Sequence, residues 1–477
     1  MENQKQLFRY ESLAKELETK IQNGTYRSGD KLPSIREFHH HLNLSISTVY
    51  KAFIELEAVG LIEARPKSGY YVSPPQPVLR KPVFIRRDAE PRKVDLSCVA
   101  QSIHNAIGNP EILPLGGAII SPELFPYKHF SRIVKGISAN EMKTLMAYAP
   151  GRGIFELRRQ IAMRTVGIFG KIDADDVIIT NGCMEALALS LQAVVKPGDT
   201  IAIETPTFFT ILRLLEELGV YVLEVPTDPR YGVDPDELEK VIAKNDIKAC
   251  LFMPNFQNPL GALMPDSSKK RIVDMLNREN IPIIEDDIYA ELYFGKKRPG
   301  TMKKYDAKGL VMSCSSFSKT LAPGLRIGWI LADEPLRERV QKLKSVISIS
   351  SSNLDQYVMS KFLESGGYDR HLRSLRKALN RQVLSMASSI QKHFPHNTRL
   401  AIPEGGAFLW VGLPGGIDGL TVFEKAMENN IAVLPGIACS ASDRYKSYLR
   451  INCGYPFLEP VEEGIAILGQ IIKSITC

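Results

Sequence analysis

The sequence predicts an α/β protein in two parts, a small helical unit followed by a larger domain built on a mostly parallel β-sheet. At 477 residues the chain is longer than one ordinary domain. Residues 1–72 show helical spacing of apolar side chains, whereas short apolar runs alternate with amphipathic stretches from about Val94 onward. A Pro-rich, basic segment separates the two patterns. We therefore expect domains over residues 1–72 and 94–477, joined by a linker over residues 73–93.

The composition excludes several classes of protein. Hydrophobic residues make up 44% and charged residues 24% of the chain, which is typical of globular proteins. No apolar run is long enough to span a bilayer, and the first residues do not resemble a secretory signal. The seven cysteines are scattered and form no CxxC pair, which argues for reduced thiols and against a structural zinc site. The expected compartment is the cytoplasm, with no membrane contact and no bound metal.

The formal net charge of +7 is concentrated in the linker. Residues 73–93 carry six basic and two acidic side chains, whereas residues 1–72 carry ten and nine. This composition is typical of an extended coil, which is either a solvated spacer or a segment that attracts a polyanion. As a coil the segment would span very roughly 25 Å, and fully stretched about 70 Å.

Residues 1–72 are expected to form three helices and a hairpin. The helices are predicted over residues 7–23, 34–42 and 45–59, and the strands over residues 62–65 and 70–72. Ser34, with Glu37 three residues later, predicts the capped start of the second helix. In a helix-turn-helix with a two-stranded wing, the third helix enters the major groove of DNA. A three-helix bundle that binds another protein is the alternative.

Two strings, Lys31-Leu32-Pro33-Ser34-Ile35-Arg36 and Ser47-Thr48-Val49-Tyr50, resemble those of GntR-type winged helices. The resemblance extends over nearly all of residues 5–72 and implies that DNA is contacted by Arg36, Ser45, Ser47, Thr48, Arg65 and Gly69. Arginines and short hydroxyls suit phosphates or base edges, and a glycine lets the wing backbone approach closely. Ile46 departs from the family, because many members carry arginine there; a contact with a thymine methyl is one way in which its base readout would differ. The consecutive His39, His40 and His41 point different ways on a helix, so they are not expected to bind metal.

Four apolar runs in the larger domain predict buried strands. They cover residues 177–179, 200–203, 249–253 and 281–284. Runs of this kind, separated by helical stretches, indicate a mostly parallel sheet that is buried on both faces. Ligands of such sheets collect at the carboxyl ends of the strands, and the chemically distinctive residues of this chain follow these strands.

Lys319 is the residue around which a cofactor site can be built. It lies among small hydroxyl residues, and Arg326 follows seven positions later. A lysine amine in a confined site can form a Schiff base, while hydroxyls and a guanidinium can hold a phosphate. An imine-forming lysine beside a phosphate clamp is what pyridoxal 5'-phosphate (PLP) requires. A polar surface loop is the alternative.

The string from Ser313 to Trp329 resembles the lysine segment of fold-type-I aminotransferases of the aminoadipate and kynurenine kind. The resemblance implies that PLP is bound as an aldimine on Lys319. Around the phosphate it implies Gly182, Cys183, Met184, Ser316, Ser318 and Arg326, with Tyr148 supplied by the neighbouring subunit of a homodimer.

The same resemblance assigns the groups around the pyridine ring. Phe208 would stack on the ring, and Asn258 and Tyr289 would reach its phenolic oxygen. Asp286 would keep the pyridine nitrogen protonated, which makes the ring an electron sink. Its neighbours Glu285 and Asp287 are expected to be solvent-exposed or capping groups. Arg450 would bind the carboxylate of an amino compound through a bidentate pair.

A GntR-like winged helix, a linker and an aminotransferase-like domain, in this order, resemble MocR-type transcriptional regulators. The resemblance implies a PLP domain of large and small subdomains that senses a small amino compound through the aldimine at Lys319. Binding would then alter the occupancy of double-stranded DNA, an operator with paired half-sites. The protein would work in a bacterial cytoplasm, at the nucleoid when bound to DNA.

Two alternatives remain open. One is a catalytically active aminotransferase of class I/II, fused to a winged helix and acting on an amino acid and a 2-oxoacid, because no assignable catalytic residue is missing. The other is a scaffold that does not bind PLP, although so complete a set of residues has no structural need.

Overall fold

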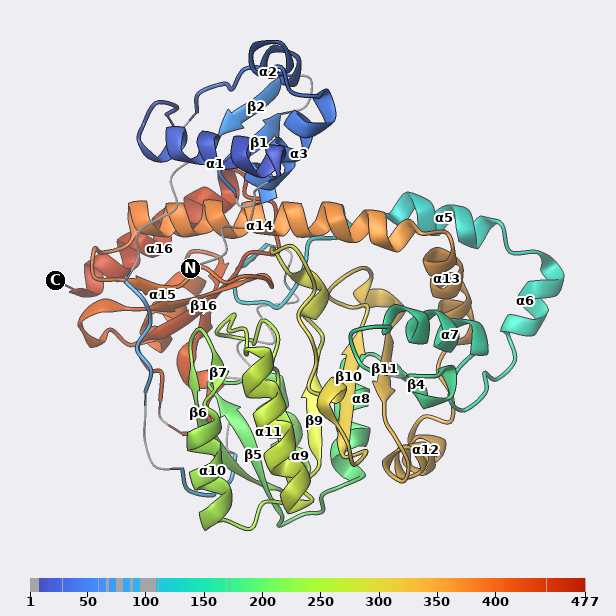
Figure 1. The fold of residues 1–477 in the computed structure, drawn as a ribbon. Coiled ribbons are helices and arrows are strands. Elements are labelled where there is room, and N and C mark those ends of the chain that lie inside the picture. Colours follow the sequence, from blue (N-terminus) through green and yellow to red (C-terminus); the bar gives the residue numbers. More distant parts are fainter. Residues whose placement is uncertain are drawn as a thin grey trace, which may run out of the picture. The chain divides into compact units, whose positions relative to one another are not determined.

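A computed structural model of the protein describes residues 8–27, 29–58, 60–65, 68–73, 80–85, 89–94, 109, 111–170, 172–442 and 444–476 (Figure 1). The chain divides into two compact units, residues 1–78 with 294–297 and residues 79–293 with 298–477. None of the helices in the described ranges is both long and apolar enough to cross a membrane.

The first unit is a helix-turn-helix with a wing, as predicted. Its elements are α1 (Arg9–Gln22), α2 (Ile35–Leu42), α3 (Ile46–Ala58), β1 (Ile62–Arg65) and β2 (Gly69–Val72). The two strands are antiparallel, with Ile62 opposite Val72. At the start of α2 the Ser34 hydroxyl accepts the Glu37 N–H at 3.2 Å, and the Glu37 carboxylate accepts the Ser34 N–H at 2.5 Å. The predicted capping box is therefore present.

A small core fixes α3 in the first unit. Phe53 is fully buried and meets Phe38 of α2 and Tyr70 of β2 edge-on, with ring centroids 5.6 and 4.8 Å apart. Leu13 and Leu17 of α1 complete this core. Burial of each such side chain stabilises the fold by about 1.5–3 kcal/mol, so one face of α3 is committed to the interior.

The second unit contains an eight-stranded sheet, in the order β4-β11-β10-β9-β8-β5-β6-β7. The strands are β4 (Val177–Asn181), β5 (Thr200–Thr205), β6 (Tyr221–Asp228), β7 (Gly232–Val233), β8 (Ala249–Phe252), β9 (Ile283–Asp286), β10 (Val311–Ser316) and β11 (Ile327–Leu331). Pairing is parallel from β10 through β9, β8 and β5 to β6, whereas β11 and β7 pair antiparallel with their neighbours. The prediction of a mostly parallel sheet is confirmed.

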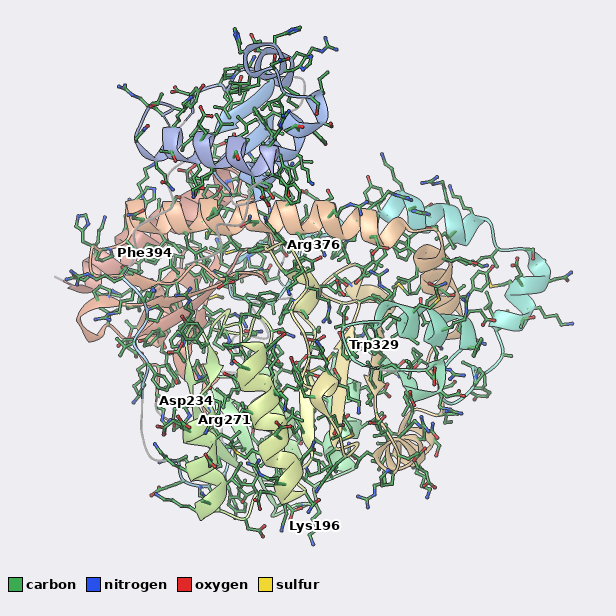
Figure 2. The ribbon with its side chains drawn as sticks, viewed as in Figure 1. Lys196, Asp234, Arg271, Trp329, Arg376 and Phe394 are labelled. Carbon is green, nitrogen blue, oxygen red and sulfur yellow. The ribbon has the colours of Figure 1, made fainter. Side chains whose placement is uncertain are left out.

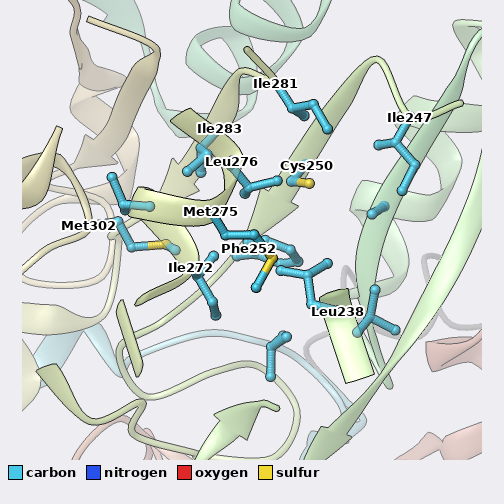
Figure 3. Close-up of a cluster of buried hydrophobic side chains, with 14 of the residues drawn as sticks. Leu238, Ile247, Cys250, Phe252, Ile272, Met275, Leu276, Ile281, Ile283 and Met302 are labelled. Atoms are coloured by element: carbon cyan, nitrogen blue, oxygen red, sulfur yellow. The ribbon is translucent and has the colours of Figure 1, made fainter. Parts of the chain in front are cut away.

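Helices cover this sheet and bury its apolar side chains. Helices α8 (Cys183–Gln192), α10 (Pro235–Lys244) and α11 (Asp266–Glu279) lie along the strands (Figure 1). Figure 3 shows part of the resulting core, in which Leu238 of α10 and Leu276 of α11 lie among residues of β8 and β9. Because both faces are covered, the strands carry continuous apolar runs instead of alternating ones.

A second, smaller sheet has the order β12-β13-β16-β15. Its strands are β12 (Arg399–Leu400), β13 (Phe408–Gly412), β15 (Leu434–Pro435) and β16 (Tyr448–Asn452), while β3 (Leu113–Pro114) pairs in parallel with β14 (Ile431–Ala432). The long helix α14 (Gly367–His393) carries Arg376, which donates to the Glu291 carbonyl at 3.2 Å (Figure 2). The other α-helices are α5 (Tyr127–Lys135), α6 (Ala139–Leu145), α7 (Phe155–Arg164), α9 (Phe209–Glu217), α12 (Leu336–Ile347), α13 (Asn353–Glu364), α15 (Gly419–Met427) and α16 (Glu459–Thr476).

The described parts of the predicted linker do not form a free coil. The Arg80 carbonyl accepts the Leu400 N–H at 2.7 Å, and Arg92 exchanges two backbone hydrogen bonds with Val222 of β6. Strand β7 covers only the end of β6, so Val222 has backbone groups left for Arg92. Val94 is buried, and Ala89 packs on the core of the large sheet. The expectation of a free coil over residues 73–93 is therefore wrong at Arg80 and Arg92, which pair with the second unit. Residues 74–79 and 86–88 lie outside the described ranges.

Candidate functional site

The predicted site residues of the second unit follow consecutive strands of the large sheet. Gly182 follows β4, and Phe208 follows β5. Asn258 follows β8, Asp286 is the last residue of β9, and Ser316 is the last residue of β10. Because β5, β8, β9 and β10 are parallel, their carboxyl ends lie at one edge of the sheet. Chain folding thus brings together residues that are more than a hundred positions apart.

Lys319 lies in the loop after β10, and its Nζ donates to the Ala118 carbonyl at 2.6 Å. Burial, and then the neighbouring Arg450 guanidinium, lower the pKa of Lys319 to about 8. At pH 7 about a tenth of the amine is therefore neutral. Such an amine is suited to forming an imine with an aldehyde, because only the neutral form is nucleophilic.

Asp286 is a buried carboxylate whose hydrogen-bond donors are neutral. Its Oδ1 accepts from the Cys183 thiol at 3.5 Å and from the Ile288 N–H at 3.2 Å. Burial raises the pKa of Asp286 to about 7. A cationic N–H placed against this carboxylate would remove the cost of its ionisation, and the protonated nitrogen of a pyridine ring is such a group.

Asn258, Tyr289 and Arg450 form one hydrogen-bonded chain. The Asn258 side-chain amide donates to the Tyr289 hydroxyl at 3.4 Å, and its oxygen accepts from Arg450 Nη1 at 2.8 Å. Burial raises the pKa of Tyr289, so its hydroxyl stays protonated and can donate. The Asn258 amide and the Tyr289 hydroxyl, both able to donate to a ligand hydroxyl or oxyanion, thus lie beside the Arg450 guanidinium.

Arg450 lies on β16 and is completely buried. Its Nη2 donates to the Gly116 carbonyl, and its guanidinium lies 4.8 Å from the centroid of the Phe408 ring. Its Nε has no acceptor among the described residues. A buried N–H without an acceptor is costly, and a ligand carboxylate is the group that would satisfy it.

The phosphate end of the candidate site is formed by the start of α8 and by Arg326. Gly182 has a positive φ of 84°, and a Cβ there would lie 2.3 Å from Arg326 Nη2, so only glycine fits. Arg326 is exposed and donates to the Asn181 carbonyl at 3.0 Å. The first N–H groups of α8, which begins at Cys183, are available for an anion.

The remaining predicted residues take different places. Ser316 is buried and accepts the Ser318 N–H at 3.2 Å. Phe208 is half-buried and meets Phe209 edge-on at 5.2 Å. Met184, on α8, is also half-buried. Tyr148 is 82% exposed, so within one chain it is a surface residue.

Of the two carboxylates beside Asp286, Glu285 is a capping group, one of the two predicted roles, whereas Asp287 differs from its prediction. Glu285 is buried and accepts the N–H of Met302 at 2.7 Å, where a short helix begins, so it is a capping group that is not exposed. Asp287 is also buried; it forms an ion pair with Arg298 and accepts from Asn255 at 2.8 Å. Sequence reasoning missed Arg298, because a partner eleven positions away carries no local signal.

Sequence reasoning also missed the groups that hold the Lys319 loop. From α14, the Tyr368 hydroxyl donates to the Thr320 hydroxyl at 2.8 Å, and His371 Nε2 lies 2.7 Å from the Thr320 carbonyl. Both side chains are buried. The long helix therefore fixes the residue next to Lys319, and only a tertiary structure can reveal that contact.

The first unit exposes several of its predicted DNA contacts. Arg36, Ser45, Ser47 and Gly69 are exposed, and Thr48 is half-buried. The Ser45 hydroxyl accepts the Thr48 N–H at 3.1 Å and lies 2.9 Å from the Ser47 hydroxyl, so it caps α3. The backbone of Arg65 pairs with Gly69 across the wing, while its side chain lies outside the described part of the chain. His39 Nδ1 lies 2.6 Å from the Leu44 carbonyl, and the described residues contain no cluster suited to a metal ion.

Comparison with known proteins identifies both units. The family of class I and II aminotransferases matches residues 126–457, and the gntR family of bacterial regulatory proteins matches residues 9–72. The chain is 36% identical over 473 residues to YjiR of Escherichia coli, an uncharacterized HTH-type transcriptional regulator. That similarity covers 97% of this chain and 98% of the relative.

Solved structures match the second unit. Kynurenine aminotransferase of Pyrococcus horikoshii, in complex with PMP, superposes with a TM-score of 0.75 at 27% identity, over 80% of this chain and 96% of the other. LysN of Thermus thermophilus, an α-aminoadipate aminotransferase complexed with N-(5'-phosphopyridoxyl)-L-leucine, gives 0.74 at 26%, with the same coverage. The cofactor of this domain is therefore PLP. Given this domain order along the full length, the chain belongs to the MocR-type transcriptional regulators, in which a GntR winged helix precedes a fold-type-I aminotransferase domain.

Proposed function

We propose that the protein senses a small amino compound at PLP on Lys319 and thereby changes how its winged helix occupies an operator. The observation that carries this proposal is Arg450, a buried guanidinium in the electrostatic neighbourhood of Lys319 whose Nε has no acceptor among the described residues. An amine that also bears a carboxylate would satisfy both groups. Amino acids and related compounds are therefore the proposed effectors.

The residues of this chain suit PLP one by one. When bound, PLP supplies an aldehyde that reacts with amines and a ring that withdraws electrons. Lys319 offers a partly neutral amine, and Asp286 offers a buried carboxylate to the pyridine nitrogen. Asn258 and Tyr289 offer donors to the phenolic oxygen, while Gly182 leaves room beside Arg326 for the phosphate.

The segment before the sheet gives a physical link between ligand and protein shape. The Gly116 and Ala118 carbonyls now accept from Arg450 and Lys319. A ligand carboxylate on Arg450 would compete with Gly116 for the same donor, so ligand binding would favour release of this segment. Strand β3, which directly precedes it, pairs with β14. Ligand binding would then bias the pairing of β3 with β14 within the second unit.

We also propose that the active form is a homodimer with shared PLP sites. Exposed apolar side chains gather around Tyr148: Met146 is 82% exposed, Ile349 57% and Val346 83%. The two segments that carry them are neighbours in space, since Asn353 donates to the Ala147 carbonyl and a Cβ on Gly151 would meet the Ile349 carbonyl at 3.9 Å. A patch of this kind is typical of a protein interface. A dimer would carry two winged helices to an operator with paired half-sites.

Transaminase activity is a second candidate function, because Lys319, Asp286 and Arg450 have environments that also suit catalysis. One experiment separates the two. Full-length protein is titrated with individual amino acids, each with and without a second 2-oxoacid as amino acceptor, while PLP absorbance and binding to promoter DNA are followed together, and Lys319→Ala is the control. A regulator changes its DNA affinity in the wild type and not in the variant. If the amino acid is converted to its 2-oxoacid over many cycles while DNA affinity stays constant, the sensing proposal is wrong.

A further inference from the structure

The recognition helix α3 carries an apolar row on its exposed face. Ile46 is 52% exposed, Tyr50 49% and Ile54 44%. They are four residues apart, so they lie in one row about 12 Å long. The opposite face, with Val49, Phe53 and others, is completely buried in the core. The row is therefore not part of the core, and an occupant has to be sought outside the unit.

The charges of α3 indicate the chemistry of that occupant. The first half of the helix contains no carboxylate, and Glu55 is its first acidic residue. Ser45 caps its first turn, and the free N–H groups there carry partial positive charge. Arg36 and Lys51 are exposed nearby in sequence. A polyanion would be attracted to the positively charged start of α3 and repelled by the carboxylates near its end. This distribution is the one expected of a helix that enters a DNA groove by its N-terminus.

Ile46 has no hydrogen-bonding group with which to read a base edge. In the major groove the apolar feature of a base pair is the 5-methyl group of thymine. Tyr50 lies one turn further, about 6 Å along the helix, which is close to two base-pair steps of about 3.4 Å. Its ring is apolar, and its hydroxyl can donate or accept one hydrogen bond.

We propose that Ile46 and Tyr50 determine operator specificity by packing on the methyl groups of two thymines in each half-site. Ile54 lies a further turn from the N-terminus, where recognition helices leave the bases, and contributes little. This inference rests on the proposed DNA binding and names the bases that are read.

The test starts from duplexes selected from a randomised library by the full-length protein. Each thymine of a selected duplex is then replaced by deoxyuridine, which removes only the methyl group. We expect replacement at the contacted positions to weaken binding about fourfold, the factor that corresponds to burial of one methylene-sized group. Ile46→Ala should bind the thymine duplex about as weakly, and should lose no further affinity on the deoxyuridine duplex. Ile46→Arg should select sites with guanine at that position.

Ile54→Ala is the matched control, because this residue belongs to the same helix and row. It should retain wild-type affinity and the same response to deoxyuridine. Selected sites that bind equally well with thymine and deoxyuridine would overturn the inference while leaving DNA binding intact. If the protein selects no DNA at all, the proposed function fails first. If Ile54→Ala and Ile46→Ala weaken binding equally, and without dependence on the methyl groups, the row does not read thymine methyls and the inference is wrong.

Discussion

Replacing Asp286 with asparagine is expected to stabilise the second unit of the PLP-free protein at neutral and alkaline pH. Burial raises the pKa of this carboxyl from 3.8 to about 7. Its donors, the Cys183 thiol and the Ile288 N–H, both meet Oδ1, which an asparagine retains. Above pH 7 the wild-type carboxylate is therefore ionised in a buried site without a directly bonded cation.

The size and sign of the effect follow from the two pKa values. The interval between 3.8 and about 7 corresponds to about 4 kcal/mol at most. Since the folded pKa lies above the unfolded one, the folded chain holds the proton longer. The contribution of Asp286 to the wild-type free energy of unfolding therefore falls as pH rises from about 4 to about 7 and is level above that range. The D286N variant lacks this titration, so its advantage should grow from near zero at pH 4 to a few kcal/mol at pH 8.

Tryptophan fluorescence during urea unfolding measures this difference. Both tryptophans, Trp329 (labelled in Figure 2) and Trp410, belong to the second unit by their positions in the sequence, so the signal reports that unit alone. The pKa of the buried Glu204 is raised mainly by burial and only in the smallest part by the Asp286 charge, so its titration nearly cancels between the two proteins. Asp175→Asn is the control, because the Arg158 guanidinium lowers the pKa of that exposed carboxyl and its loss should not stabilise. A D286N advantage that stays constant between pH 4 and 8 would refute the reasoning.

Three further predictions follow from the site and the domain order. The rate at which the PLP-free protein takes up PLP should rise about tenfold per pH unit below pH 8 and become constant above it, because the pKa of Lys319 is about 8 and only the neutral amine attacks. Stopped-flow absorbance measures this rate, and the Lys319→Ala variant should yield no adduct after borohydride reduction. Arg450→Lys should weaken binding of an amino-acid effector about 10- to 100-fold, while the corresponding decarboxylated amine binds as before, since bidentate pairing is lost; absorbance titration compares the two ligands. A fragment that begins at residue 79 should bind PLP without binding DNA, which a gel shift tests. It should also unfold at a higher urea concentration than a fragment that begins at Val94, because the shorter fragment lacks the pairing of Arg92 with Val222; urea unfolding curves compare the two.

Much of the fold could be predicted because its signals are local. The Ser34–Glu37 capping box, the helical spacing and the hairpin are each formed by residues that are close together in the sequence, and the structure contains all three. The cofactor residues could be predicted because each follows a recognisable apolar strand, and a parallel sheet brings strand ends together. Local chemistry and sheet geometry were sufficient for these parts.

Contacts between distant segments could not be predicted from the sequence. The sequence around Asp287 resembles an acidic loop, and only the fold shows that Arg298 neutralises it in the interior. In the same way, His371 lies 51 positions from Thr320 and has no pattern that connects it to Lys319. The pairing of the linker could not be predicted, because its composition favours solvation, whereas the unpaired backbone N–H and carbonyl of Val222 at the edge of the sheet bind Arg92. Composition is a property of the segment alone, whereas its burial depends on the tertiary contacts that the rest of the chain makes with it.

The pairing of the linker with the second unit changes what a two-site operator requires. With all 21 residues of the linker free, about 70 Å of reach would make the half-site spacing unimportant. Arg80 is bound to the second unit, so only six residues separate it from Ser73 at the end of the wing. Those residues span about 25 Å at full stretch and about 15 Å as a coil. Half a DNA turn is about 17 Å, so such a displacement already uses most of that reach. The spacing of the half-sites would then be set by where a dimer holds its two Arg80 residues, and only secondarily by the length of the linker.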